Sequence, residues 1–127
     1  MSDSRVIFVG MHNKPHMRPL DIGTKTGKLI RRIVKELPEG TEVVKTNLYD
    51  IDHFPNAFEM HDLKDEWYWT HLPVDGDVIV LLGQFVHKLF SRHLDGIIKV
   101  AHPASKWSHK AMDEYVTRTS EKIIKKL

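Results

Sequence analysis

Four short segments of this 127-residue chain hold residue types that can do chemistry. They read "GMHNKPHM" from Gly10, "TNLYD" from Thr46, "GQ" from Gly83 and "HPASKW" from His102, and each follows an apolar run. A buried strand needs only a polar turn to end it, so a His-Pro pair with a lysine and a tryptophan behind it exceeds that need. Histidine and asparagine side chains both offer hydrogen-bond donors and acceptors. The four segments are therefore candidates for a binding or catalytic site.

Each segment also has a purely structural explanation. Gly10 and Gly83 can allow tight turns, Asn47 can cap a turn through its side chain, and His102 can be a packed loop residue. Taken singly, these explanations are the simpler ones. Taken together, at the ends of four predicted strands, they favour one site, because ligands of open parallel sheets bind beyond the carboxyl ends of the strands.

The elements that must position these residues follow from the apolar pattern. "VIFV" is typical of a strand buried on both faces of a parallel sheet. Strands alternating with helices predict an α/β fold with a mostly parallel sheet. We expect strands at 6–9, 41–46, 77–82 and 97–100, helices at 24–37, 84–92 and 110–126, and a loop with one short helix at 48–76.

The helix patterns also predict which side chains point inward. The first helix should bury Leu29, Ile30, Ile33, Val34 and Leu37, the second Phe85, Leu89 and Phe90, and the last Met112, Tyr115, Val116, Ile123 and Ile124.

Length and composition limit the class of protein. At 127 residues, with 41% hydrophobic and 28% charged residues, the chain is expected to be one globular domain, residues 1–127. It contains no cysteine, which excludes disulfides, thiolate metal sites and cysteine nucleophiles. No apolar run has the length of a membrane helix, and the first residues lack the order of a signal peptide. We expect a cytoplasmic protein without a membrane association.

Basic residues gather in two regions although the net charge is only +2. One region runs from Lys14 to Lys35 and the other from Lys106 to Lys126. If the two regions meet in space, they form a basic face suited to a polyanion. The alternative is that they are solvated helix faces.

Other motifs are weaker. "GMHNKP" has neither the glycine spacing of a dinucleotide-binding loop nor the Gly-Lys-Ser/Thr of a P-loop. His61, Asp62, Asp65 and His71 could be arranged around a metal, but they lack the His-Glu-x-x-His spacing. The aromatic residues of "EWYWTH" suit a core or a lid. No metal and no cofactor are expected.

In their order along the chain, the segments resemble the uracil-DNA glycosylase superfamily. The similar pieces are the glycine-led loop after the first strand, "TKTGKLI" at a helix start, "TNL", "VLLG" and the His-Pro loop after the last strand. They cover about Val6 to Tyr115. The resemblance implies a three-layer α/β/α sandwich with a four-stranded, mostly parallel central sheet.

The resemblance also implies roles for individual residues. Such proteins flip a base out of DNA and break its N-glycosidic bond. Asn47 would read the edge of the base, and His102 would hydrogen-bond the base oxygen on which charge gathers. His12 or Asn13 would position the water. Gly10, Met11 and Met17 would line the base pocket.

DNA, double- or single-stranded, is the partner that the resemblance implies, and the protein would act as a monomer in DNA repair. The "ASKW" turn would enter the duplex with Trp107 as a wedge. Further contacts to the DNA would come from Lys14, Lys25, Ser105, Lys106 and Lys110.

The chain departs from the family pattern in its first loop. Met11-His12-Asn13-Lys14-Pro15 is shifted relative to the family, and the aromatic residue that stacks on the base is replaced by His16, Met17 or Leu20. The expected substrate is therefore an altered pyrimidine, either uracil or a modified uracil or cytosine. Two alternatives remain: a non-catalytic module that binds DNA or a modified base, and an N-glycosidic hydrolase or deoxyribosyltransferase acting on free nucleosides or nucleotides.

Overall fold

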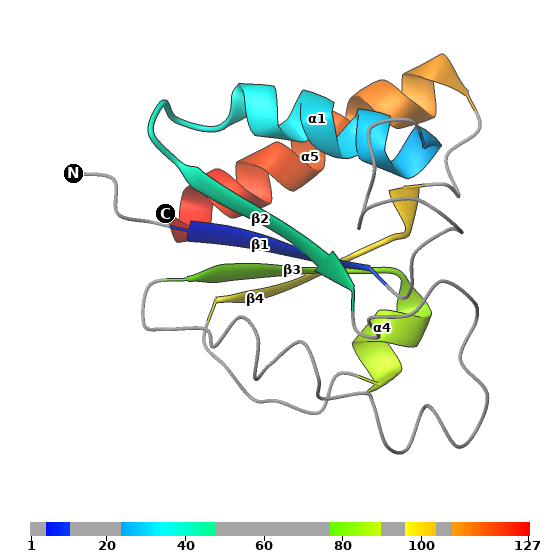
Figure 1. The fold of residues 1–127 in the computed structure, drawn as a ribbon. Coiled ribbons are helices and arrows are strands. Elements are labelled where there is room, and N and C mark those ends of the chain that lie inside the picture. Colours follow the sequence, from blue (N-terminus) through cyan, green and yellow to red (C-terminus); the bar gives the residue numbers. More distant parts are fainter. Residues whose placement is uncertain (1–4, 11–23, 48–76, 90–95, 104–107) are drawn as a thin grey trace.

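A computed structural model of the chain describes residues 5–10, 24–47, 77–89, 96–103 and 108–127 (Figure 1). The predicted loop at 48–76, the end of the predicted helix at 84–92 and the side chains of Phe85, Leu89 and Phe90 lie outside this description. The elements are β1 (Arg5–Gly10), α1 (Lys25–Glu36), β2 (Glu42–Asn47), β3 (Val78–Leu82), α4 (Gln84–Leu89), β4 (Ile97–Val100) and α5 (His109–Lys126).

The four strands form one sheet in the order β2-β1-β3-β4, and every described pair is parallel. The prediction of an α/β fold with a parallel sheet is confirmed. Val6, Ile7, Phe8 and Val9 are fully buried, as expected for a strand covered on both faces. From β1 the chain continues to β2 at one edge of the sheet, and from β3, the other neighbour of β1, it continues to β4 at the opposite edge. The strand order therefore reverses between β1 and β3, which is where ligands bind in open α/β sheets.

The main core lies between one face of the sheet and the pair α1 and α5. The two helices lie together on this face in Figure 1, while α4 lies on the other side, beyond the carboxyl end of β3. The core is made by alternate residues of the strands and by the inward faces of both helices, including Phe8, Val80, Ile30, Ile33 and Ile123. The sequence predicted most of this core, because apolar residues repeat with helical spacing in both helices.

The inward face of α5 differs from the prediction at three positions. Ile124 is 43% exposed, whereas Thr119 and Ser120 are buried. Each residue turns a helix by about 100°, so a face centred on Ile123 carries Ile124 out toward solvent. Ser120 is tolerated inside because its hydroxyl donates to the Val116 carbonyl at 2.6 Å. Among the described side chains of α4, Val86 is buried, a residue that the pattern did not single out.

Side-chain caps fix where α1 and α5 begin. The hydroxyl of Thr24 accepts a hydrogen bond from the Gly27 amide at 2.9 Å, and the hydroxyl of Ser108 accepts one from the Ala111 amide at 3.0 Å. Each cap satisfies an amide that has no partner within its helix. Both helices start within about one residue of the predicted positions.

The amino end of the sheet is held by an ion pair between neighbouring strands. Arg5 donates to Asp77 through Nε at 3.3 Å and through a terminal nitrogen at 2.6 Å, and the Asp77 side chain is only 4% exposed. Gly96 lies against the same turn: a Cβ there would come within 2.4 Å of the Asp77 carbonyl oxygen. This end of the sheet is built for stability and lies opposite the predicted site.

None of the described helices is long and apolar enough to cross a bilayer.

Candidate functional site

The carboxyl ends of the four strands share one end of the sheet, because all four run in the same direction (Figure 1). Gly10 ends β1, Asn47 ends β2, Gly83 follows β3, and His102 follows β4 by one residue. These four residues define what we call the carboxyl rim. The structure thus brings all four sequence-predicted segments to one end of the sheet, at least at the residues where each begins.

Gly10 and Asn47 are direct neighbours on the rim. They are register partners in the parallel pair β1–β2, and both are buried, with Asn47 only 3% exposed. Buried polar side chains are held in hydrogen bonds in folded proteins. Asn47 is therefore an immobilised amide beside the last residue of the central strand. Asn47 is thus a fixed part of the rim and not an exposed turn residue.

Gly83 and His102 form the second contact of the rim. Gly83 has a φ of +93°, and a Cβ at this position would come 3.1 Å from the Cβ and 3.4 Å from the Cδ2 of His102. The absence of a side chain at Gly83 thus lets His102 pack against the backbone of this residue. Glycine suits this position for two reasons, because the backbone is left-handed there and because a side chain would press against His102.

Two hydrogen bonds hold the backbone around this contact. The Gly83 amide donates to the Val100 carbonyl at 3.0 Å, which extends the β3–β4 ladder to the rim. The Tyr115 hydroxyl donates to the Ala101 carbonyl at 2.6 Å, which ties α5 to the residue before His102. His102 is thus anchored from the sheet on one side and from α5 on the other.

The surroundings of His102 affect its protonation. Partial burial lowers the pKa of the imidazole below its ordinary value of 6.5, because withdrawal from water disfavours the charged form. The ring is therefore neutral at physiological pH. A neutral imidazole has one N–H donor and one acceptor, so it can hydrogen-bond a carbonyl oxygen without bringing a positive charge.

Asn47 and His102 do not lie side by side. They come from the two outer strands, with β1 and β3 between them. His102 packs over Gly83 at the end of β3, two strands away from β2, which Asn47 ends. The distance between Asn47 and His102 therefore corresponds to about two strand spacings, roughly 10 Å. A six-membered base ring with a hydrogen bond at each end can bridge such a gap. The two residues thus flank the point where the strand order reverses rather than meeting across a narrow cleft.

Tyr115 is a residue whose role the sequence only half revealed. The apolar pattern predicts its ring in the core, and the ring is buried. Its hydroxyl, however, is part of the rim's support through Ala101. A buried tyrosine usually finds a hydrogen-bond partner for its hydroxyl. This rule is what could have predicted a bond from Tyr115 to a neighbouring element.

His87 is a second residue that the sequence reasoning missed. It lies in α4, and its Nε2 is 2.9 Å from the Leu81 carbonyl oxygen. A carbonyl can only accept, so Nε2 carries the proton. This bond attaches α4 to β3 beneath the rim.

The remaining predicted site residues divide into two groups. Lys25 and Lys110 lie in the first turns of α1 and α5, which begin on the rim side of the sheet because each follows a strand's carboxyl end; Lys110 is exposed and Lys25 partly so. The others lie outside the described residues: Met11, His12, Asn13, Lys14, Met17, Ser105, Lys106 and Trp107.

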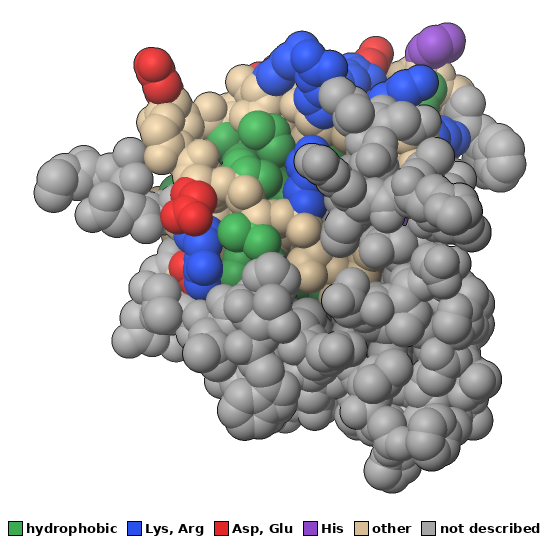
Figure 2. Space-filling model, viewed as in Figure 1, with side chains coloured by type: hydrophobic (Ala, Val, Ile, Leu, Met, Phe, Trp, Pro, Cys, Tyr) green, Lys and Arg blue, Asp and Glu red, His purple; other side chains and the backbone are tan. Residues whose placement is uncertain are grey.

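The two basic regions of the sequence are brought together by the pair α1 and α5. Arg32 of α1 and Asp113 of α5 form an exposed ion pair at 2.6 Å, and the helices pack along each other. Lysine and arginine side chains gather over these helices at the top of Figure 2. The condition for a basic face is thus met within the described helices, and the positive ends of both helix dipoles point to the rim.

Neither a metal site nor a relative adds to this picture. In the described part of the chain, no group of three histidine, aspartate or glutamate residues is arranged to hold a metal ion. No protein-family model matches the sequence, and a comparison with curated proteins gives no significant match.

Proposed function

We propose that this protein is a DNA glycosylase of the uracil-DNA glycosylase type, which flips an altered pyrimidine out of DNA and hydrolyses its N-glycosidic bond. In this proposal the parallel sheet with α1 and α5 on one face and α4 on the other is the core of a three-layer α/β/α sandwich. The order of the rim segments in the sequence is what suggests this family.

The observation that carries the proposal is the packing of His102 against Gly83. This contact lies across the point of strand reversal from the buried pair Gly10 and Asn47. Structural needs alone do not require a histidine at that place, because a turn after β4 needs no imidazole. A base entering between β1 and β3 would meet an amide on one side and an imidazole on the other.

The chemistry follows from the state of these two groups. As the glycosidic bond breaks, negative charge develops on the departing base and positive charge on the sugar. A neutral imidazole that donates a hydrogen bond to the base oxygen stabilises the charged transition state more than the ground state, and would therefore accelerate the reaction. The Asn47 amide would select the base through its donor and acceptor.

DNA binding is supported by charge. Lys25 and Lys110 lie beside the two helix N-termini at the rim. Phosphates bind favourably at helix N-termini and near lysines, and such contacts position DNA without reading its sequence. His12 or Asn13 remains our proposal for the water-positioning residue.

The experiment is incubation of the full chain with duplexes and single strands that each carry one altered pyrimidine, followed by alkaline cleavage at abasic sites. We expect strand breaks with at least one uracil or modified-pyrimidine substrate, and fewer breaks with the His102→Ala variant. A protein that binds these DNAs and breaks none of them is a binding module instead. Release of base from free nucleosides, without action on DNA, would favour the nucleoside-hydrolase alternative.

A further inference from the structure

A groove runs along the outer edge of the sheet, between β4 and α5, away from the rim's centre. It consists of two adjoining hollows of about 250 Å³ and about 520 Å³, which share Lys99 and Lys122. The first hollow reaches Ala101, next to His102, and the second reaches Lys126 at the far end of α5. We call this feature the edge groove. It connects the rim with the opposite end of the sheet.

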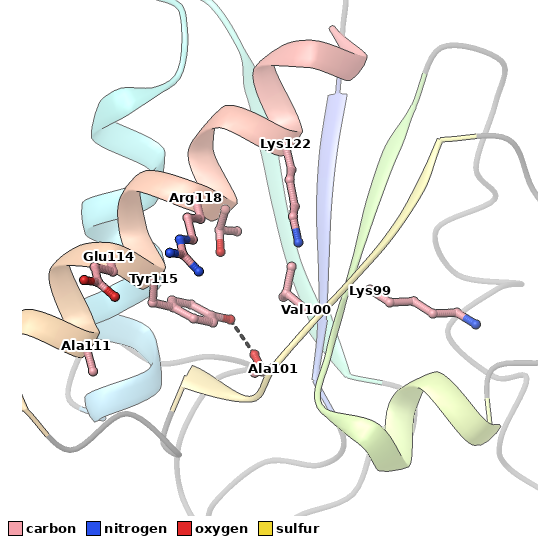
Figure 3. A pocket seen from close by; sticks show the side chains of 9 residues that line it. Lys99, Val100, Ala101, Ala111, Glu114, Tyr115, Arg118 and Lys122 are labelled. Carbon is pink, nitrogen blue, oxygen red and sulfur yellow. Dashed lines mark hydrogen bonds between the residues drawn. The ribbon is translucent and has the colours of Figure 1, made fainter.

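The α5 wall of the edge groove carries a row of cations. Arg118, Lys122 and Lys126 are four residues apart, so they lie on one side of the helix, about 6 Å apart along its axis. Figure 3 shows Arg118, Lys122 and Tyr115 projecting from α5 on the side that faces β4, whereas Lys99 points away from them on the other side of the strand. Among the described residues, no carboxylate forms an ion pair with any of these cations.

The stability of the helix explains only the two ends of this row, because Glu114 precedes Arg118 by a favourable four residues and Lys126 lies in the last turn, where the helix dipole favours a cation. Like charges four residues apart repel each other and destabilise an isolated helix. Glu114 is the acidic residue among those that line the groove. The three cations still repel one another along the groove, and an anion bound there would relieve this repulsion.

The other wall of the groove is β4, the last strand of the described sheet on this side. Among the described strands, β4 pairs with β3 alone. The carbonyls of Gly96 and Val100 bond to β3, so the main-chain groups of Ile97 and Lys99 face the other way, by the alternation of a parallel ladder. Backbone N–H groups are, with lysine and arginine, the usual donors to phosphates.

We infer that the edge groove binds the sugar–phosphate backbone of a single-stranded stretch of nucleic acid that continues from the DNA held at the rim. The groove begins one residue from His102 and is basic along its α5 wall. The combined hollows have the volume of a ligand of nucleotide size, which suits one strand and not a duplex. The inference deepens the proposed function, and it rests on that function only for the position of the DNA at the rim.

An acidic peptide that adds a strand to β4 is the competing occupant. Two features oppose it. Lysines around an edge strand are a device that prevents strand addition. In addition, the bond from Tyr115 already takes the Ala101 carbonyl, so the edge is occupied at its rim end.

The test compares a short blunt duplex with the same duplex carrying an oligo-dT extension, at either strand end, by fluorescence anisotropy with the full chain. The variant is Arg118→Gln/Lys122→Gln/Lys126→Gln, whose glutamines preserve helix propensity. Three phosphate contacts on a single strand add about 2 to the slope of log affinity against log salt. We therefore expect the extension to make binding to the parent tighter and roughly twentyfold more sensitive to a rise from about 50 to about 200 mM salt. The triple variant should lose this increment and still bind the blunt duplex.

The matched control is Lys28→Gln/Arg31→Gln/Lys35→Gln on the exposed face of α1, which removes the same charge elsewhere. It should keep the increment from the extension. An extension that adds nothing to the parent, or an equal loss in the control, overturns the inference. Groove-dependent binding of polyglutamate without any effect of the extension also overturns it and identifies an acidic peptide as the partner.

Failure of the proposed function gives a different pattern. If no altered base is excised and the blunt duplex does not bind, oligo-dT alone is measured with the parent and the triple variant. Binding of oligo-dT that depends on the three basic residues supports the edge groove while the glycosylase proposal falls. Equal binding by parent and triple variant overturns the inference.

Discussion

The side chain of His102 packs so closely against Gly83 that a Cβ on residue 83 would press against it. A Cβ on Gly83 would come 3.1 Å from the His102 Cβ, and the Gly83 φ of +93° belongs to the left-handed region. The end of β3 and the loop after β4 are thus fitted to each other at the rim. This relationship has consequences for stability and for the chemistry of His102.

The substitution Gly83→Ala should destabilise the protein and displace His102. We expect a loss of about 1–2 kcal/mol in the free energy of unfolding from backbone strain, measured by urea titration, together with a shift of the His102 ring signals in NMR spectra. Gly40→Ala is the control, because Gly40 has a similar φ of +87° but lies in the turn before β2. It should cost a similar free energy and leave the His102 signals in place. Unchanged His102 signals in Gly83→Ala would refute the contact.

The pKa of His102 should lie below 6.5, because partial burial disfavours the charged ring. In the unfolded chain the imidazole takes up its proton near 6.5, and in the folded chain only at lower pH. The contribution of His102 to the free energy of unfolding therefore falls as the pH decreases through the window below 6.5. NMR titration of the C–H signals measures the pKa directly. A midpoint at or above 6.5 contradicts the prediction.

His102 and Asn47 should affect excision differently if the proposed function is right. His102→Ala should lower the single-turnover rate by about 10²–10³, the usual cost of losing one donor to a developing negative charge, with little change in binding. Asn47→Ala should weaken binding of the altered base and leave binding of unmodified DNA unchanged. Equal rates for the parent and His102→Ala would remove the assigned role of the imidazole.

Tyr115→Phe should loosen the support of His102. The change deletes the 2.6 Å hydrogen bond to the Ala101 carbonyl and should cost about 1 kcal/mol in the free energy of unfolding. Burial raises the pKa of the Tyr115 hydroxyl well above 10, outweighing the opposing effect of Thr119. Its contribution to stability is therefore present below pH 10 and is lost as the pH rises beyond that value. In absorbance titrations, parent and variant should show the same amplitude of tyrosine ionisation near pH 10. A larger amplitude in the parent means that Tyr115 ionises normally.

Asp77→Asn should weaken the fold without affecting the rim. Its side chain is 4% exposed and accepts two hydrogen bonds from Arg5, so we expect a loss of about 1–3 kcal/mol in the free energy of unfolding. Asp113→Asn, which breaks an exposed ion pair with Arg32, should cost less than about 1 kcal/mol. Below its unfolding temperature, Asp77→Asn should bind DNA as the parent does. An effect on DNA binding comparable to that of rim variants would mean that the two ends of the sheet are coupled.

The sequence by itself determined the strands, the helices and the end of the sheet at which the special residues gather. "VIFV" and "DVIVLL" are continuous apolar runs typical of buried strands, and the helical spacing from Leu29 to Leu37 left one inward face for α1. These features are local, since they depend on continuous apolar runs and on a helical spacing of 3.6 residues that the chain itself carries. The parallel direction of the strands then placed Gly10, Asn47, Gly83 and His102 at one end.

Only the tertiary structure decided which of these residues meet. Strand order is a non-local property, and it put Asn47 and His102 on the two outer strands with β1 and β3 between them. The packing of His102 on Gly83 and the bond from Tyr115 to Ala101 join residues from separate elements, and no spacing in the sequence records them. The edge groove arises in the same way, because the row of cations on α5 faces a second wall only when the helix packs beside β4.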